Sequence, residues 1–240
     1  MRAAQKGTGV IPIGDENPTH RTPIVTLTLV IVNVIVFGLQ LLQGIDFTLR
    51  FSFVPLALTQ LLEGRGSLWV LVSMVTAMFL HGSFGHIFGN MLFLWIFGDN
   101  VEDVFGRVPY VLFYLMCGIA ATLTQYLTGP LSPIPNLGAS GAISGVLGAY
   151  VLMFPAARVN LFIWPFSIFF GTFGVPAFLW IGFWFLMQLF LGVQDLGQIT
   201  EGGVAFWAHI GGFVAGLALT LVMPRRRRRA YPVPRTYRYR

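Results

Sequence analysis

Four polar side chains in otherwise apolar stretches of this 240-residue sequence are of types that carry out acyl transfer. Ser140 and His209 offer a hydroxyl and an imidazole, a weak nucleophile and the base that removes its proton. His86 and Asn90 are four residues apart, so on a helix they share one face and can donate to one developing anion. Ser140 follows a proline-rich segment into a helix start, where backbone N–H groups without intrahelical partners favour an oxyanion.

The composition places these residues in a membrane protein. Hydrophobic residues make up 55% of the chain and charged residues 10%, against roughly 25% charged in an average soluble domain. Stretches of about 20 residues without a formal charge recur, and each can cross a hydrocarbon layer of about 30 Å. A soluble globule, a disulfide-rich secreted domain and a disordered chain are excluded. The single cysteine, Cys117, lies in an apolar run and is expected to be a small packing residue.

The elements that must position the four side chains are predicted to be six membrane-spanning helices in an all-α bundle. Residues 1–21 form an N-terminal segment, 22–223 the six-span domain and 224–240 a basic tail. A long outer loop at about 43–83 contains a short apolar helix at 67–80, and the stretch 161–174 is interrupted by proline and glycine. The predicted spans are 23–42, 84–103, 107–128, 138–157, 175–193 and 204–223.

The distribution of basic residues predicts the orientation of these spans. With both termini in the cytoplasm, thirteen of the fifteen basic residues lie on the inner side, and only Arg50 and Arg65 fall outside. The second, fourth and sixth spans then run inward from the outer face. His86, Ser140 and His209 lie a few ångströms below that face, with Asn90 about one turn deeper. No acidic residue lies in a span on this side, so a Ser–His dyad is expected rather than a Ser–His–Asp triad.

Small residues predict that the fourth and sixth spans touch. Ser140, Ser144 and Gly148 are spaced by four, and His209, Gly212 and Gly216 are spaced by three and four. Such stripes allow transmembrane backbones to approach closely, which would turn Ser140 towards His209. The alternative is that the glycines serve packing alone, with the serine hydroxyl bonded to a nearby carbonyl.

Other polar residues receive structural interpretations. Asn33 and Gln188 are lone amides expected to bond between helices. The acids at the inner end of the second span are expected to be solvated at headgroup level; they are Asp99, Glu102 and Asp103. The five arginines from Arg225 to Arg229 follow a span, which favours binding to anionic lipid headgroups over nucleic acid. No metal-binding spacing such as His-Glu-x-x-His occurs, so no metal or cofactor is expected.

Three strings in order resemble the signature motifs of the rhomboid family of intramembrane serine proteases: HGSFGHIFGN at 81–90, GASG at 138–141 and AHIGGFVAG at 208–216. The resemblance extends over about residues 20–223. It implies a multi-pass hydrolase in which Ser140 is the nucleophile and His209 the base. His86 and Asn90 would form the oxyanion hole beside the backbone N–H of Ser140. Implied substrates are single-span transmembrane proteins cut near the outer face, at a plasma-membrane location.

One departure from the family pattern concerns the base. Some members place a tyrosine against it, four residues after the nucleophile, where this chain has Ser144. Ser144 or a water molecule is then the candidate for orienting His209. Two other functions stay open at this point. One is a catalytically inactive relative that binds transmembrane helices. The other is a small transporter with His86 and His209 as a proton relay, although the inverted repeat typical of transporters is not evident.

Overall fold

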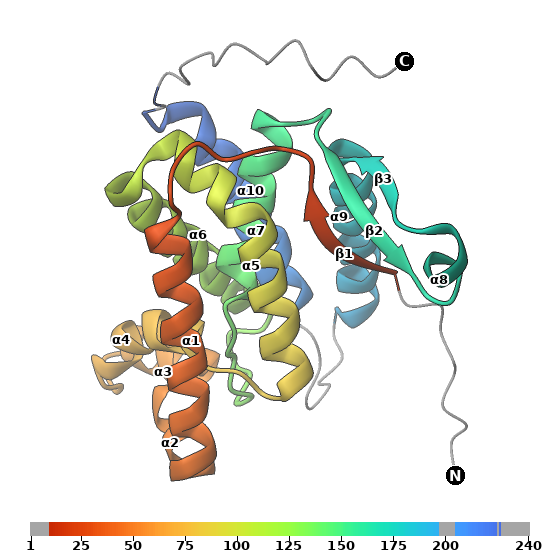
Figure 1. Cartoon of the computed structure of the whole chain (residues 1–240). Coiled ribbons are helices and arrows are strands. Elements are labelled where there is room, and N and C mark those ends of the chain that lie inside the picture. Colours follow the sequence, from red (N-terminus) through yellow and green to blue (C-terminus); the bar gives the residue numbers. More distant parts are fainter. Residues whose placement is uncertain (1–9, 197–204, 225, 227–240) are drawn as a thin grey trace, which may run out of the picture.

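The computed structural model describes residues 10–196, 205–224 and 226. Its main body is a bundle of long helices, arranged as Figure 1 shows. Each long helix coincides with a predicted span, and the prediction of a helical membrane bundle is confirmed. The six are α1 (Ile24–Gln43), α5 (Phe84–Phe105), α6 (Arg107–Thr128), α7 (Ser140–Met153), α9 (Ala177–Asp195) and α10 (Phe206–Val222).

Length and composition separate these helices into two groups. Within the described residues, α1, α6 and α9 are long and apolar enough to cross a membrane. A bent pair adds a fourth if it counts as one span: α4 (Trp69–Thr76) with η1 (Ala77–Phe79), followed by α5 at an angle of 81°. The apolar helices α7 and α10 are shorter, and the 14 residues of α7 extend only about 21 Å. The count of six spans therefore stays a prediction.

The centre of the bundle is α7, whose residues 141–150 are all buried. It packs against α10 so closely that no side chain fits between the two backbones. A Cβ atom added at Gly212 would lie 1.9 Å from the carbonyl oxygen of Gly141, and one at Gly216 would lie 2.1 Å from that of Gly145. The predicted contact between the two small-residue stripes is confirmed. Cys117 of α6 is buried against the same face, where a Cβ at Gly145 would meet its Sγ at 2.4 Å.

The long loop between α1 and α5 is folded rather than extended. It contains α2 (Ile45–Phe51), α3 (Pro55–Leu62), α4 and η1, so the short apolar helix predicted at 67–80 is present. These elements share a small apolar core of their own, made by Phe53, Leu58, Val70, Met74 and Ala77. The loop ends at His81, whose backbone N–H donates to Gln40 Oε1 at 2.9 Å.

A three-stranded antiparallel sheet lies beside the bundle and was not indicated by the sequence pattern. Its order is β1 (Val10–Asp15), β2 (Arg158–Ile163), β3 (Phe173–Pro176), with α8 (Phe166–Phe170) between the last two. Thus part of the predicted N-terminal segment pairs with the interrupted stretch before α9. Burial raises the pKa of the Asp15 carboxyl. That carboxyl accepts hydrogen bonds from the Tyr150 hydroxyl of α7 and from Asn100 Nδ2 of α5.

Two structural interpretations made from the sequence are wrong. Glu102 and Asp103 are buried rather than solvated, with 3% and 9% of their surfaces exposed. Glu102 accepts from the backbone N–H groups of Val25 and Thr26 at 3.0 and 2.8 Å. The first turn of α1 has unpaired donors and a positive dipole end, which a carboxylate satisfies. Asn33 does not bond between helices either, because its Nδ2 donates at 2.7 Å to Leu29 in its own helix.

Candidate active site

Ser140 and His209, from α7 and α10, meet where the two backbones are in contact. Ser140 is the first residue of α7, and His209 lies in the first turn of α10. The distance between Ser140 Oγ and His209 Nε2 is 2.8 Å, within a normal hydrogen bond. His209 is 9% exposed. The pair therefore has the spacing required for proton transfer from a hydroxyl to an imidazole.

The glycine of the GASG string determines how the chain enters α7. Gly138 has φ of +133°, a conformation that L side chains rarely adopt. A Cβ at this position would also lie 2.9 Å from Nε2 of His86. The Gly138 N–H donates to the Ala77 carbonyl at 2.9 Å, which ties the turn to η1. Glycine thus allows the turn before Ser140 to lie directly against the His86 ring.

His86 and Asn90 lie on α5 and face the same space as Ser140. The Gly82 N–H approaches His86 Nδ1 at 3.4 Å, so Nε2, next to Gly138, is left to act as a donor. Asn90 is 8% exposed, and its Nδ2 has no hydrogen-bond partner in the described part of the chain. The α7 ladder begins with Ile143 donating to Ala139, so the N–H of Ser140 is also free of intrahelical bonding.

These groups line a cleft of about 730 Å³ between α5, α7 and α9. The α5 wall includes Gly85 and Gly89, where an added Cβ would meet nothing within 4 Å. Trp184 of α9 lines the cleft from the other side. The structure brings all four residues predicted from the sequence to one cavity.

Two contacts of His209 are not apparent from the sequence. Gln188 Oε1 of α9 lies 2.8 Å from His209 Nδ1, and the Trp184 ring centroid lies 6.0 Å from that of His209. The expected interhelical bond of Gln188 is therefore confirmed, with His209 as its partner. Ser144 makes no hydrogen bond to the base in the described part of the chain; its hydroxyl donates to the Ser140 carbonyl at 2.7 Å. The only signal in the sequence was a lone amide in an apolar helix, which is costly unless paired.

The fold and the cleft define a polytopic helical membrane protein in which a half-buried serine is paired with a buried histidine. A family model described as "Rhomboid domain" matches residues 66–226, well over half of the chain. The chain belongs to the rhomboid family.

Named relatives agree with this membership. Rhomboid protein 1, mitochondrial, of Saccharomyces cerevisiae is 31% identical over 150 residues, which are 61% of this chain and 40% of that protein. Rhomboid protease GluP of Bacillus subtilis is 33% identical over 164 residues, 67% of this chain and 28% of that protein. Presenilin-associated rhomboid-like protein A, mitochondrial, of Danio rerio is 35% identical over 96 residues, 38% and 24% of the two chains. The chain thus matches less than half the length of each of these relatives.

Proposed function

We propose that this protein is an intramembrane serine endopeptidase that hydrolyses peptide bonds of transmembrane proteins. The observation that carries the proposal is the 2.8 Å contact between Ser140 Oγ and His209 Nε2 at the wall of an open cleft. Family membership supports the same activity, since one relative is named a rhomboid protease. No cofactor is required for this chemistry.

In the first half of the reaction, Ser140 Oγ attacks the carbonyl carbon of the scissile bond. His209 Nε2 takes the hydroxyl proton as the new C–O bond forms, and the carbonyl oxygen becomes an oxyanion. Three donors face that oxygen: the N–H of Ser140, Nε2 of His86 and Nδ2 of Asn90. The unpaired Nδ2 of Asn90 supports this role. A donor that is already oriented before the reaction stabilises the developing charge without any rearrangement of the protein.

In the second half, the tetrahedral intermediate collapses and the C–N bond breaks. His209 gives its proton to the departing amine, which leaves an ester between the substrate and Ser140. A water molecule, deprotonated by His209, then attacks the ester carbon and restores the serine hydroxyl. Polar groups that line the cleft, including Ser83 and Asn136, provide a route for this water.

The proposed setting is a plasma membrane with both termini in the cytoplasm and the cleft opening to the opposite face. Single-span transmembrane proteins are the proposed substrates, entering from the bilayer. The arginines from Arg225 to Arg229 would bind anionic headgroups. Of that run only Arg226 belongs to the described residues, and its N–H donates to the Val104 carbonyl at 2.8 Å.

A fluorophosphonate probe on the detergent-solubilised protein tests the nucleophile. We expect covalent labelling of the wild type, none for Ser140→Ala, and labelling of the control Ser144→Ala within a few-fold of the wild type. In cleavage of a model transmembrane substrate, Ser140→Ala should retain less than about a hundredth of activity, since removal of a serine nucleophile elsewhere costs far more. Equal losses in both variants would refute the choice of serine. An unlabelled but folded wild type would instead indicate an inactive, helix-binding relative.

A further inference from the structure

The partner of one imidazole nitrogen decides what the other can do. Neutral imidazole carries one proton, so one ring nitrogen donates and the other accepts. In His209, Nδ1 faces Gln188 Oε1 and Nε2 faces Ser140 Oγ, each at 2.8 Å. A carbonyl oxygen only accepts, so Nδ1 must hold the proton. Nε2 is then left with the lone pair that receives the proton of Ser140.

The reverse orientation of the amide would disable the pair. If Gln188 turned its NH₂ group towards Nδ1, that nitrogen would have to accept, and the proton would move to Nε2. His209 would then donate to Ser140 instead of removing its proton. The side of the amide that faces His209 therefore selects between a competent and an incompetent base.

Several contacts fix the position of α9, the helix that carries Gln188. The side chain is 8% exposed, and Trp184, one turn earlier on the same face, lies against the His209 ring. Further along α9, the Gly192 carbonyl accepts from Trp207 Nε1 of α10 at 3.0 Å. At its other end, the Ala177 N–H donates to the Ala157 carbonyl at 2.8 Å. The first two contacts hold α9 against α10 on both sides of Gln188, and the third ties the start of α9 to the segment that follows α7.

We infer that Gln188 is the positioning residue of this protein: its carbonyl oxygen fixes the tautomer and the orientation of His209, in the place that an acid occupies in other serine enzymes. The inference rests on the proposed function. Ser144 does not fill the role, because His209 Nδ1 is bonded to Gln188 and the Ser144 hydroxyl donates to the Ser140 carbonyl. The dyad thus receives its third group from α9, the helix that forms the opposite wall of the cleft.

Two substitutions of Gln188 separate hydrogen bonding from packing. Gln188→Met keeps the length of the side chain but loses the acceptor, whereas Gln188→Glu keeps an acceptor. Asn33→Leu is the matched control, since Asn33 is also a buried amide in a span but bonds within its own helix. For Gln188→Met we expect kcat to fall about 10- to 100-fold, because the base is still present but no longer held in place, and loss of a positioned base altogether costs about 100- to 10,000-fold. KM should change less than about threefold. Gln188→Glu should recover most of that loss, and Asn33→Leu should leave kcat unchanged.

A readout independent of turnover is the ¹⁵N spectrum of the imidazoles. The chain has four histidines, and His209→Ala identifies the signals of His209 in histidine-labelled protein. We expect the Nδ1–H tautomer in the wild type and Asn33→Leu, and loss of that preference in Gln188→Met. An Nε2–H tautomer in the wild type, or a kcat of Gln188→Met equal to that of Asn33→Leu, would overturn the positioning role.

Fluorophosphonate labelling distinguishes this failure from failure of the proposed function. If the wild type is labelled and Gln188→Met is labelled at the same rate, only the role of Gln188 is refuted. If the folded wild type is not labelled at all, the protease assignment is refuted, and the inference is refuted with it. Slower labelling of Gln188→Met, with faster labelling restored in Gln188→Glu, supports both.

Discussion

At the scale of single residues, the site contains two kinds of polar group. His209 is already hydrogen-bonded to Ser140 through one ring nitrogen and to Gln188 through the other. Asn90 Nδ2, by contrast, is buried without a partner among the described residues. A buried donor of this kind costs about 1–3 kcal/mol. Asn90 lines the cleft, so this donor is placed to bond to a ligand or a transition state.

The role of Asn90 can be measured by removing its amide. If Asn90 stabilises the oxyanion, Asn90→Ala should lower turnover by roughly 10- to 1000-fold, the upper end being that of an oxyanion-hole donor elsewhere. The melting temperature should fall little if at all, because no hydrogen bond among the described residues is lost. Both quantities are measured on the same purified sample with a model transmembrane substrate.

His86 provides the companion test. His86→Ala should also lower turnover, and the double variant should lose less than the product of the single losses if both side chains bind one oxygen. Normal turnover per folded molecule combined with a large drop in melting temperature would show that Asn90 is structural instead.

At the scale of elements, the site depends on how closely α7 and α10 approach. The Gly216 Cα lies so near Gly145 that an added Cβ would be 2.1 Å from a backbone oxygen, which cannot move aside as a flexible side chain can. The same contact continues at Gly212, one turn from His209. The distance between Ser140 and His209 is therefore set by glycines that carry no chemistry themselves.

Alanine at Gly216 tests this dependence. We expect Gly216→Ala to destabilise the protein by about 1–3 kcal/mol or more, as overpacking of a close contact does. Turnover should fall as well, because the helices are forced apart. The matched control is Gly182→Ala on α9, where a Cβ would meet nothing within 4 Å; it should leave melting temperature and turnover near wild-type values. Equal effects of the two substitutions in thermal unfolding and cleavage assays would contradict the packing account.

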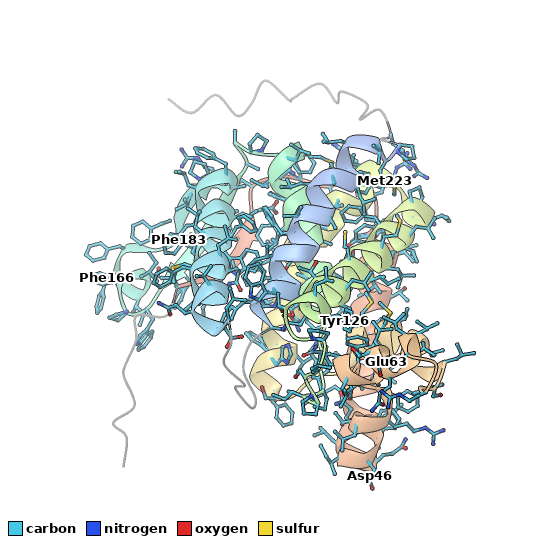
Figure 2. The ribbon with its side chains drawn as sticks, turned by 180° about the vertical axis from the view of Figure 1, so that it is seen from behind. Asp46, Glu63, Tyr126, Phe166, Phe183 and Met223 are labelled. Atoms are coloured by element: carbon cyan, nitrogen blue, oxygen red, sulfur yellow. The ribbon has the colours of Figure 1, made fainter. Side chains whose placement is uncertain are left out.

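At the scale of the whole molecule, many large apolar side chains are exposed on the outside, as expected of a protein that lies in a bilayer. Figure 2 shows Phe166 and Phe183 at the periphery of the bundle, and these rings are 54% and 61% exposed. Asp46 and Met223 lie at opposite ends of the molecule in the same view. The loop that contains α2 and the end of α10 are thus separated by the length of the bundle, which agrees with opposite sides of one membrane.

Reporter fusions test the predicted topology. A reporter fused after Arg240 should be cytoplasmic, because most basic residues lie on the side of the membrane predicted to hold the C-terminus. A reporter inserted at the exposed turn of Gly64 should be on the other side. Readings from the same side at both positions would mean that the count of six spans is wrong. The proposed opening of the cleft to the outer face would then be wrong as well.

The sequence by itself determined the features that depend on local chemistry. Apolar stretches of sufficient length gave the positions of all six long helices. The small-residue stripes Ser140–Ser144–Gly148 and His209–Gly212–Gly216 predicted which two helices touch, since only small residues permit that distance. The pairing of Ser140 with His209 followed from that contact.

Only the tertiary structure decided which distant groups meet. The N-terminal strand β1 pairs with β2, and Glu102 caps α1, because unpaired backbone groups far along the chain needed partners. Gln188 reaches His209 only because α9 folds back against α10. Periodicity and composition report which face of a helix is apolar. They do not report which neighbour that face meets, and for this reason the third group at the site was found in the structure.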